Sequence, residues 1–444
     1  MDFFPKNFIW GTATSSYQIE GAGNEGGKGE SIWDKFAHST KKINNNDTGD
    51  IACNHYHLYK EDIAHMKEMG VNAYRFSISW PRIFPHGRGL INQEGIDFYN
   101  NLIDHLVANE IQPFITLHHW DLPLELSKSG GWSSRETVDA FVNYAETCFE
   151  AYGDRVKYWI TFNEPLVFTV LFSRWGVYQK HNGKTFNLRR AVQASHLVNC
   201  AHARTVQKFK DIKIKGGKVG ITHVAMPAYG KGFFNKKIAK IAYDISVRWW
   251  IEPSLKGCYP LKLFKWFKFL FRAPMVEDGE LSLIEENIGD FIGINYYRPL
   301  RIGKNKELTM KYNDVGWEVY PRGLLDLLKD IDEIYEKPEI FITENGFPSS
   351  NEPESVEMRI EDDERCDYIK NHLLALNQAI KTGINIKGYF LWSLMDNFEW
   401  LHGYSTRFGL IHVNFANQQR TWKKSANLYK NIISNDRTKE LIEN

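Results

Sequence analysis

The chain has 444 residues, and its 55 Lys and Arg residues nearly balance its 54 Asp and Glu residues, which gives a formal net charge of +1. This balance argues against a protein that binds a nucleic-acid backbone, because such proteins need a marked basic excess. A hydrophobic fraction of 43% with 25% charged residues is typical of a globular protein and excludes a disordered chain. The 14 Trp residues suit either core packing or the binding of sugar rings.

Eight short apolar runs, rich in β-branched and aromatic residues, predict buried strands. In chain order they span residues 8–12, 73–80, 113–118, 158–162, 218–224, 291–295, 340–343 and 387–392. Amphipathic segments lie between most of these runs and predict helices. They span residues 57–69, 94–109, 135–152, 188–209, 323–335 and 361–382.

The repeated alternation of strands and helices predicts the fold class. Length alone allows two or three ordinary domains or one large barrel. Because no linker rich in Pro or Gly interrupts the alternation, we expect one α/β domain over residues 1–444, a (β/α)₈ TIM barrel. A doubly wound sheet is the second interpretation.

Five scattered cysteines without a Cys-x-x-Cys spacing indicate free thiols in a reducing compartment. The first ten residues lack the pattern of a signal peptide, and no run of about 18 apolar residues predicts a membrane-spanning helix. We therefore expect a cytoplasmic protein without a membrane partner.

Polar or aromatic side chains follow nearly every predicted strand, where barrel enzymes collect their active-site residues. These residues are Gln18, Arg75, His119, Asn163, Glu164, His223, Asn295, Tyr297, Glu344, Asn345 and Trp392. Glu164 and Glu344 each end an apolar strand, the fourth and the seventh, and a closed barrel would bring them together across its mouth. Two carboxyl groups in environments that separate their pKa values are typical of a glycosidase.

The sequence resembles glycoside hydrolase family 1, the β-glucosidase family, over essentially its whole length. Seven motifs in family order carry the resemblance: FIWGTATSSYQIEG (8–21), YRFSISWP (74–81), LHHWDLP (117–123), TFNEP (161–165), DFIGINYY (290–297), ITENG (342–346) and LWSLMDNFEW (391–400). The resemblance implies a retaining β-glycosidase on a (β/α)₈ barrel, without a cofactor or a metal ion.

The resemblance also implies roles for individual residues. Glu164 would be the general acid/base and Glu344 the nucleophile, while Arg75 and Tyr297 would keep Glu344 ionised. Trp392 would stack on the sugar, and Trp317 would line the leaving-group entrance. The residues expected to bind substrate are Gln18, His119, Asn163, Asn295, Trp317, Trp392, Glu399, Trp400 and Phe408.

The expected substrates are short β-glucosides such as cellobiose and aryl glucosides, in carbohydrate metabolism and cellulose degradation. A carboxylate at Glu399 would repel a sugar phosphate and favours an unphosphorylated sugar. A 6-phospho-β-glucosidase and a broad β-galactosidase or β-fucosidase of the same family remain alternatives, as does an inactive carbohydrate-binding protein. Leu166 stands where a Trp often follows Asn-Glu-Pro in the family, which bears on the leaving group.

Two further patterns have more than one interpretation. His55, His57 and His65 fit no strong metal-ligand spacing, so we expect surface-helix histidines and no metal. Residues 261–272 (LKLFKWFKFLFR) interleave basic and aromatic residues, which suits a membrane surface, a nucleic acid or a homo-oligomer contact. A barrel-surface helix that buries Phe264, Phe267 and Phe271 is favoured. We expect no nucleic-acid partner, and a homo-oligomer is possible.

Overall fold

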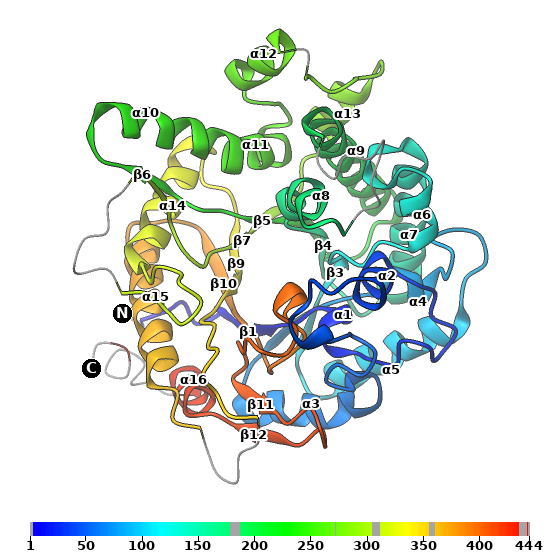
Figure 1. The fold of residues 1–444 in the computed structure, drawn as a ribbon, viewed down its shortest axis with the longest axis vertical. Helices are drawn as coiled ribbons and strands as arrows, with labels where there is room; N and C mark the ends of the chain where they lie inside the picture. The colour runs from blue at the N-terminus through cyan, green and yellow to red at the C-terminus, as the bar shows by residue number, and fades with distance from the viewer. Residues whose placement is uncertain are drawn as a thin grey trace.

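The eight apolar runs of the sequence form eight parallel strands that close into a barrel (Figure 1). The computed structural model describes residues 3–177, 187–270, 272–303, 311–354, 360–434 and 442. Strand β10 pairs with β1 and closes the barrel, so the expected (β/α)₈ fold is confirmed and the doubly wound sheet is wrong. The barrel strands are β1 (Ile9–Ala13), β2 (Ala73–Ser77), β3 (Gln112–His118), β4 (Tyr158–Asn163), β5 (Lys218–Val224), β7 (Phe291–Asn295), β9 (Ile340–Asn345) and β10 (Ile386–Trp392).

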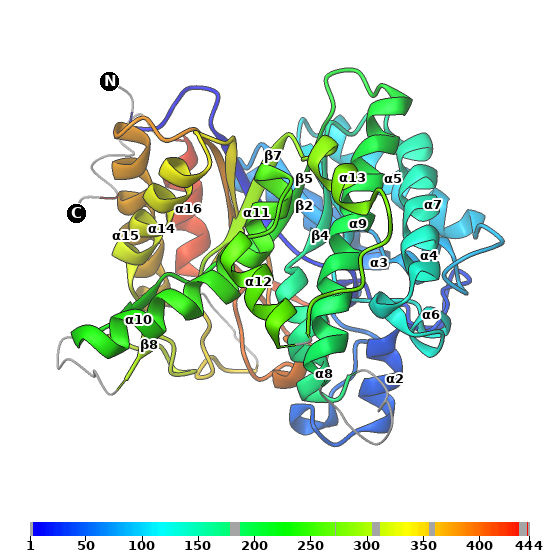
Figure 2. The ribbon, with the colours of Figure 1, turned by 90° about the horizontal axis from the view of Figure 1, so that it is seen from above.

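The helices surround this barrel (Figures 1 and 2). The six predicted helices are confirmed as α3 (His55–Met69), α5 (Gln93–Ala108), α7 (Arg135–Tyr152), α9 (Leu188–Ile212), α14 (Pro321–Ile334) and α15 (Asp363–Lys381). The further helices are α1 (Ser16–Ile19), α2 (Ile32–Ser39), α4 (Trp80–Ile83), α6 (Leu124–Lys128), α8 (Phe172–Trp175), α10 (Gly232–Tyr243), α11 (Trp249–Lys256), α12 (Leu261–Phe269), α13 (Glu280–Glu286) and α16 (Lys424–Ser434). No helix in the described part of the chain is both long enough and apolar enough to cross a bilayer.

One predicted strand ends earlier than expected. Residues 73–80 were expected to be extended, but β2 ends at Ser77 and Trp80 begins helix α4. Pro81 lies in the first turn of that helix, where a missing N–H breaks no helical hydrogen bond. Short strands outside the barrel form two small sheets, β6 (Ala228–Gly230) with β8 (Leu300–Ile302) and β11 (Ile411–Val413) with β12 (Arg420–Trp422).

Phenylalanine rings fill the barrel interior. Phe341 lies 5.5 Å from Phe114 and 5.1 Å from Phe291 between ring centroids, and Phe390 lies 4.8 Å from Phe114. These four side chains are buried. Because they plug the barrel, a substrate can enter only the space above them, at one end.

Truncating a ring in this plug should destabilise the barrel strongly. Phe341→Ala removes a fully buried ring that contacts three others, and we expect a loss of about 3–5 kcal/mol in the free energy of unfolding. Urea unfolding followed by Trp fluorescence measures this loss. Phe269→Ala, at a ring that is 78% exposed on α12, is the matched control and should change the free energy by about 0.5 kcal/mol or less. Equal losses in both variants would contradict the role of the plug.

Several Trp residues in or beside strands pack in the core, one of the two uses that the composition allows. Trp10, Trp80 and Trp159 are buried, and Trp80 stacks on Tyr144 with ring centroids 5.1 Å apart. The five cysteines are free thiols, in agreement with the sequence prediction.

Candidate active site

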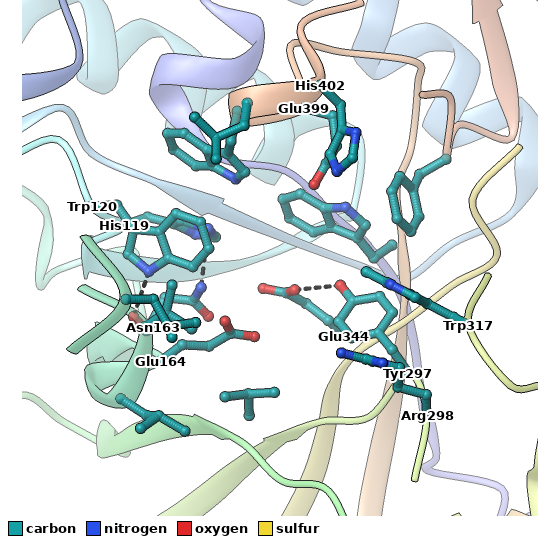
Figure 3. A pocket seen from close by; sticks show the side chains of 18 of the residues that line it. His119, Trp120, Asn163, Glu164, Tyr297, Arg298, Trp317, Glu344, Glu399 and His402 are labelled. Carbon is teal, nitrogen blue, oxygen red and sulfur yellow. Dashed lines mark hydrogen bonds between the residues drawn. The ribbon is translucent and has the colours of Figure 1, made fainter. Parts of the chain in front are cut away.

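Side chains from the carboxyl ends of the barrel strands meet around a cavity of about 290 Å³ (Figure 3). Ten of the predicted site residues line it: His119, Asn163, Glu164, Tyr297, Trp317, Glu344, Trp392, Glu399, Trp400 and Phe408. The other three hydrogen-bond to residues of the lining, Arg75 to Glu344, Asn295 to Glu164 and Gln18 to Glu399. The structure therefore brings together all thirteen residues, from positions 18 to 408 of the chain.

Two strand-end residues point elsewhere. His223 Nε2 lies 3.3 Å from Ser254 Oγ of helix α11, outside the barrel. Asn345 Nδ2 donates to Tyr368 of helix α15 at 2.8 Å. A polar residue at a strand end can thus connect the barrel to its outer helices.

Glu344 lies between a cation and a phenol. Arg75 Nη1 lies 2.6 Å from Oε1 of Glu344, and the Tyr297 hydroxyl donates to Oε2 at 2.6 Å. Burial and the negative charge of Glu344 raise the pKa of Tyr297 well above its usual value, so the phenol keeps its proton. Burial raises the pKa of Glu344 above its usual value, and the Arg75 charge and the Tyr297 hydrogen bond limit that rise by stabilising the carboxylate.

Glu164 has no cation as a direct partner among the described residues. Its Oε1 accepts a hydrogen bond from Asn295 Nδ2 at 2.7 Å. Burial and the nearby charge of Glu344 raise the pKa of Glu164 to about 8. The two carboxyl groups therefore lie in different surroundings, since Glu344 has a cation and a phenol as direct partners and Glu164 has an amide. Figure 3 shows their side chains on facing sides of the cavity.

Asn163 connects the two carboxyl groups. Its Oδ1 accepts from Arg75 Nη2 at 2.7 Å and from Asn295 Nδ2 at 3.1 Å. Since the guanidinium can only donate, Oδ1 is the carbonyl oxygen and Nδ2 donates to His119 Nε2 at 3.0 Å. His119 then carries its proton on Nδ1, a buried atom for which the described residues offer no partner. A sugar hydroxyl would satisfy that donor.

The orientation of Asn295 is also determined by its partners. The Thr343 hydroxyl donates to Oδ1 of Asn295 at 2.8 Å, which leaves the amide nitrogen to face Glu164. Thr343 and Glu344 are neighbours on strand β9, and Asn295 ends β7. Strand β9 therefore orients the Asn295 amide, and that amide positions the Glu164 carboxyl group.

Three bulky residues of the cavity adopt left-handed backbone conformations. Glu164 has a φ of 52°, Trp120 of 80° and Trp400 of 50°. Such values are uncommon for residues other than Gly, Asn and Asp and cost about 1–3 kcal/mol each. Surrounding packing must hold all three, and strained residues of this kind concentrate at functional sites.

The far wall combines aromatic faces with polar edges. His119 stacks on Trp392 with ring centroids 5.7 Å apart, and Trp120 lies 4.6 Å from Trp400. Gln18 Nε2 donates to Glu399 Oε2 at 3.3 Å. Burial and Glu344 raise the pKa of Glu399 to about 8. This wall offers flat apolar surfaces and hydrogen-bonding groups, which suit a pyranose ring.

Comparison with known proteins decides the family. A sequence model of glycosyl hydrolase family 1 matches residues 1–438. The chain belongs to this family. Beta-glucosidase A of Acetivibrio thermocellus is 43% identical over 448 residues and 98% of each chain is covered. Beta-glucosidase 12 of Oryza sativa subsp. indica is 42% identical, with 97% of this chain and 92% of that protein covered.

Solved structures of a relative share the fold. The beta-glucosidase from Thermotoga maritima in complex with deoxynojirimycin has a TM-score of 0.91 and 40% identity, covering 98% of this chain and 99% of that chain. The same enzyme in complex with galacto-hydroximolactam has a TM-score of 0.90, at the same identity and coverage. The family resemblance, the barrel and the assignment to the glycoside hydrolases are thereby confirmed.

The motif positions did not predict several residues that line the cavity of this family 1 hydrolase. Trp120 lies inside the LHHWDLP motif but was given no role, and the residues that follow the ends of two motifs are Arg298, Leu401 and His402. Others form an apolar wall after β4 and β5: Val167, Leu171, Trp175, Val224 and Met226. A π-helical turn, Val167–Leu171, carries two of them, and such turns are frequent at functional sites. Leu166, noted in the sequence for its bearing on the leaving group, also lines the cavity.

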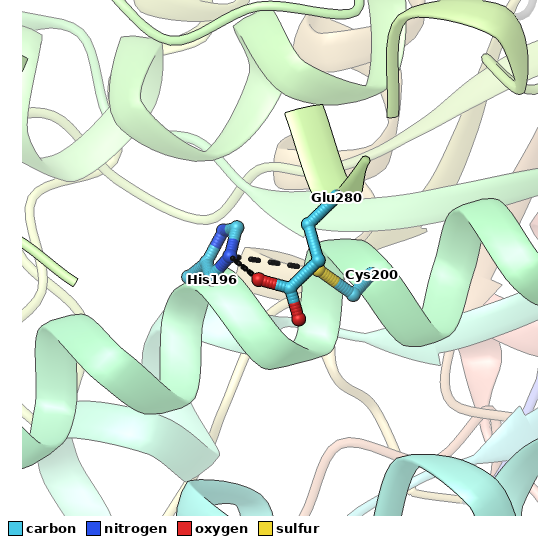
Figure 4. Close-up of side chains that lie close together, drawn as sticks. All are labelled: His196, Cys200 and Glu280. Carbon is cyan, nitrogen blue, oxygen red and sulfur yellow. Dashed lines mark hydrogen bonds and ion pairs between the residues drawn. The ribbon is translucent and has the colours of Figure 1, made fainter. Parts of the chain in front are cut away.

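A second cluster of ligand-type side chains lies between α9 and α13 (Figure 4). His196, Cys200 and Glu280 place one ligand atom each within 4.8 Å of one another. Arg135 donates to both oxygens of Glu280, at 3.0 and 3.1 Å, and burial raises the pKa of the Cys200 thiol to about 12. An adjacent guanidinium and a protonated thiol suit a hydrogen-bonded helix contact and disfavour a cation.

One of the three histidines of helix α3 departs from the expected surface position. His55 is buried, and its Nδ1 lies 2.7 Å from Asp62, which also pairs with Arg420. His57 is exposed and lies 3.0 Å from Glu25, whereas His65 is half-buried and accepts from Trp422. The surface prediction was wrong for His55 because its partner Asp62 is buried on the same helix and is paired with Arg420 from the other end of the chain.

Residues 261–269 form helix α12 on the outer surface of the molecule (Figure 1). Phe267 is buried and Phe264 is half-buried against Trp249, as the helical spacing predicts, while Phe271 lies outside the described residues. The opposite face is also apolar, with Trp266 46% and Phe269 78% exposed. Whether this face contacts another copy of the chain stays a prediction.

Proposed function

We propose that this enzyme is a retaining β-glucosidase that removes terminal β-D-glucosyl residues from short oligosaccharides such as cellobiose and from aryl glucosides. The observation that carries the proposal is the contrast between two buried carboxyl groups. Arg75 and Tyr297 stabilise the carboxylate of Glu344, whereas burial and the charge of Glu344 raise the pKa of Glu164 to about 8. One group is suited to attack and the other to donate a proton.

The first half of the reaction forms a glycosyl ester. A carboxylate oxygen of Glu344 attacks the anomeric carbon while the bond from that carbon to the leaving oxygen breaks. Glu164 gives its proton to the leaving oxygen and becomes a carboxylate. The charge of Glu344 is lost in the ester, and because that charge helps to raise the pKa of Glu164, the pKa of Glu164 falls.

The second half returns both groups to their starting states. Glu164, now ionised, accepts a proton from water as the water oxygen attacks the anomeric carbon. The ester bond breaks, Glu344 leaves as a carboxylate, and the sugar keeps its original anomeric configuration after two inversions. Arg75 and Tyr297 hold the released carboxylate ready for the next substrate.

The sugar specificity follows from the buried wall. Gln18, His119, Asn163, Glu399 and Trp400 supply the donors and acceptors around the ring, and Trp392 supplies the stacking face. A 6-phospho sugar is not favoured because the described cavity lining contains no lysine to pair with its phosphate, and ionisation of Glu399 would add repulsion. Galactosides and fucosides remain secondary substrates in this proposal, since the related Thermotoga maritima enzyme has been solved with galacto-hydroximolactam.

A substrate panel tests the proposal. We expect hydrolysis of 4-nitrophenyl β-glucoside, slower hydrolysis of the galactoside and fucoside, and the slowest turnover of the 6-phosphoglucoside. NMR at early times should show β-glucose as the first product. First release of α-glucose would contradict the retaining mechanism, and failure to hydrolyse any member would contradict the glycosidase assignment.

The pKa of Glu164 predicts the alkaline limb of activity. The raised pKa keeps the acid protonated below about pH 8, so kcat/KM should fall as the pH rises through about 8. On the acid side, kcat/KM should fall when Glu344 takes up a proton. Burial also raises the pKa of Glu399 to about 8, so either carboxyl group could cause the alkaline limb. Two variants show which of them does. The alkaline limb should persist in Glu399→Gln and disappear in Glu164→Gln; the reverse pattern would contradict the assignment.

A further inference from the structure

The floor and the mouth of the cavity differ in exposure. His119, Asn163 and Glu344 at the floor are buried, whereas Trp317 is half-buried and Arg298 and His402 are exposed. Because phenylalanine rings close the barrel below the floor, a terminal sugar must occupy the floor and its leaving group the mouth. This assignment of the two ends rests on the glucosidase function proposed above.

Arg298 is a cation at this mouth without an anionic partner. Its guanidinium lies 5.5 Å from the ring centroid of Trp317, and Figure 3 shows its side chain turned toward the cavity. Within the ranges that the structure describes, Arg298 makes no ion pair and its side chain donates no hydrogen bond. By contrast Arg301, three residues along the chain, pairs with Glu318 through two nitrogens at 2.6 and 2.9 Å.

The surroundings of Arg298 favour an oxyanion as ligand. Although Arg298 is exposed, the cavity wall removes part of the water around its guanidinium and lowers its pKa, and no nearby carboxylate opposes that shift. A guanidinium remains charged in proteins, so partial loss of water costs free energy that an anion would offset. The guanidinium lies over the Trp317 ring, and its N–H groups, which donate to no described residue, are free to bind a carboxylate.

The rest of the mouth is apolar. Leu166, Leu171, Val224 and Met226 line the cavity on the side of strands β4 and β5. An aromatic or aliphatic leaving group would bury apolar surface there, at about 25 cal/mol per Å². The cation and the apolar wall together define a leaving group with an apolar body and one negative charge.

We propose that Arg298 selects β-glucosides whose leaving group carries a carboxylate on an apolar, aryl-type body. The carboxylate accepts hydrogen bonds from the guanidinium while the ring lies against the apolar wall. Arg298 then determines specificity without taking part in bond breaking. The interaction of Arg298 with the leaving-group carboxylate is the same in the bound substrate and in the transition state. Its loss should therefore raise KM and leave kcat similar.

Two matched substrates test this proposal, 4-carboxyphenyl β-glucoside and its neutral amide, 4-carbamoylphenyl β-glucoside. The quantity measured is the ratio of their kcat/KM values, carboxylate over amide, in each protein, because differences in intrinsic reactivity cancel between proteins. Arg298→Gln should lower the ratio about tenfold relative to the unmodified enzyme, through a higher KM for the carboxylate. Arg298→Lys keeps the positive charge but loses the planar pair of N–H donors, so it should lower the ratio less than Arg298→Gln does.

The control variant is Arg322→Gln on helix α14, which removes an arginine that pairs with Asp326 away from the cavity. It should leave the ratio unchanged. Added salt should lower the ratio in the unmodified enzyme and have less effect in Arg298→Gln. An unchanged ratio in Arg298→Gln, or an equal loss of both substrates, would overturn the proposal. Lack of turnover of 4-nitrophenyl β-glucoside by the unmodified enzyme would instead overturn the glucosidase function on which it rests.

Discussion

Glu344→Gly should lower kcat/KM for an aryl β-glucoside by about 10⁵-fold, equivalent to about 7 kcal/mol of transition-state stabilisation. The variant lacks the oxygen that forms the glycosyl ester, and no other described residue occupies the position between Arg75 and Tyr297. Arg75 retains hydrogen bonds to Asn163 and to the carbonyl of Thr343, so we expect the barrel to remain folded. Near-UV circular dichroism checks the fold alongside the kinetics.

Azide should restore part of the activity of Glu344→Gly by occupying the space of the missing carboxyl group. Because the small anion attacks from the nucleophile's side in a single displacement, the product should be the α-glucosyl azide. Glu339→Gly is the matched control, since Glu339 precedes the same strand at its opposite end and pairs with Lys218. That control should keep nearly full activity. Unchanged turnover in Glu344→Gly would refute Glu344 as the nucleophile.

Glu164→Gly should have an effect that depends on the leaving group. General acid catalysis contributes about 10²–10⁴-fold, so a glucoside with a poorly acidic leaving group should lose about that factor in kcat/KM. A dinitrophenyl glucoside needs little protonation to depart and should lose much less in its first step. Glycine suits this position because Glu164 has a φ of 52°, which glycine adopts without strain.

Azide distinguishes the two carboxyl groups by product. In Glu164→Gly it attacks the glycosyl ester on Glu344, so the product should be the β-glucosyl azide, opposite to that of Glu344→Gly. Comparing kcat/KM over a series of phenyl glucosides gives the dependence on leaving-group pKa. A uniform loss across that series, or an α-azide from Glu164→Gly, would contradict the role of Glu164 as the acid/base.

The barrel could be predicted from the sequence because its strands are local patterns. Each strand is a short apolar run, and the helices between them carry an apolar stripe at helical spacing. The residues at which individual strands and helices end were less predictable. Trp80 continues an apolar run but begins helix α4, and helix α9 continues through Ile212, beyond the predicted end at Phe209. Tertiary contacts, absent from any local pattern, decide such boundaries.

Much of the site was also predictable, for a different reason. A closed parallel barrel places the carboxyl ends of all its strands at one end. Glu164 and Glu344 could therefore be expected to lie close together although they are 180 positions apart in the sequence. Family motifs then supplied the remaining residues, and the structure brings all of them together. What the sequence could not provide was the proton arrangement, which depends on Asn163 and Asn295 donating and accepting in fixed directions.

The leaving-group side was the least predictable part. Val224 and Met226 resemble ordinary core residues, and Arg298 resembles a surface residue after Tyr297. Only the closed barrel shows that they share one cavity. Similarly, the left-handed backbone at Trp120 and Trp400 is imposed by packing, since neither is a residue type that prefers it.

The central claim is that Glu344 forms a covalent bond to the sugar, and one measurement tests it directly. The enzyme is incubated with 2,4-dinitrophenyl 2-deoxy-2-fluoro-β-glucoside, which slows hydrolysis of the ester and lets it accumulate. Intact mass spectrometry should show one fluoroglucosyl group per chain, and peptide mapping should place it on Glu344 at the end of strand β9. Attachment to Glu164 or to any other residue, or inactivation without a covalent adduct, would contradict the proposed mechanism.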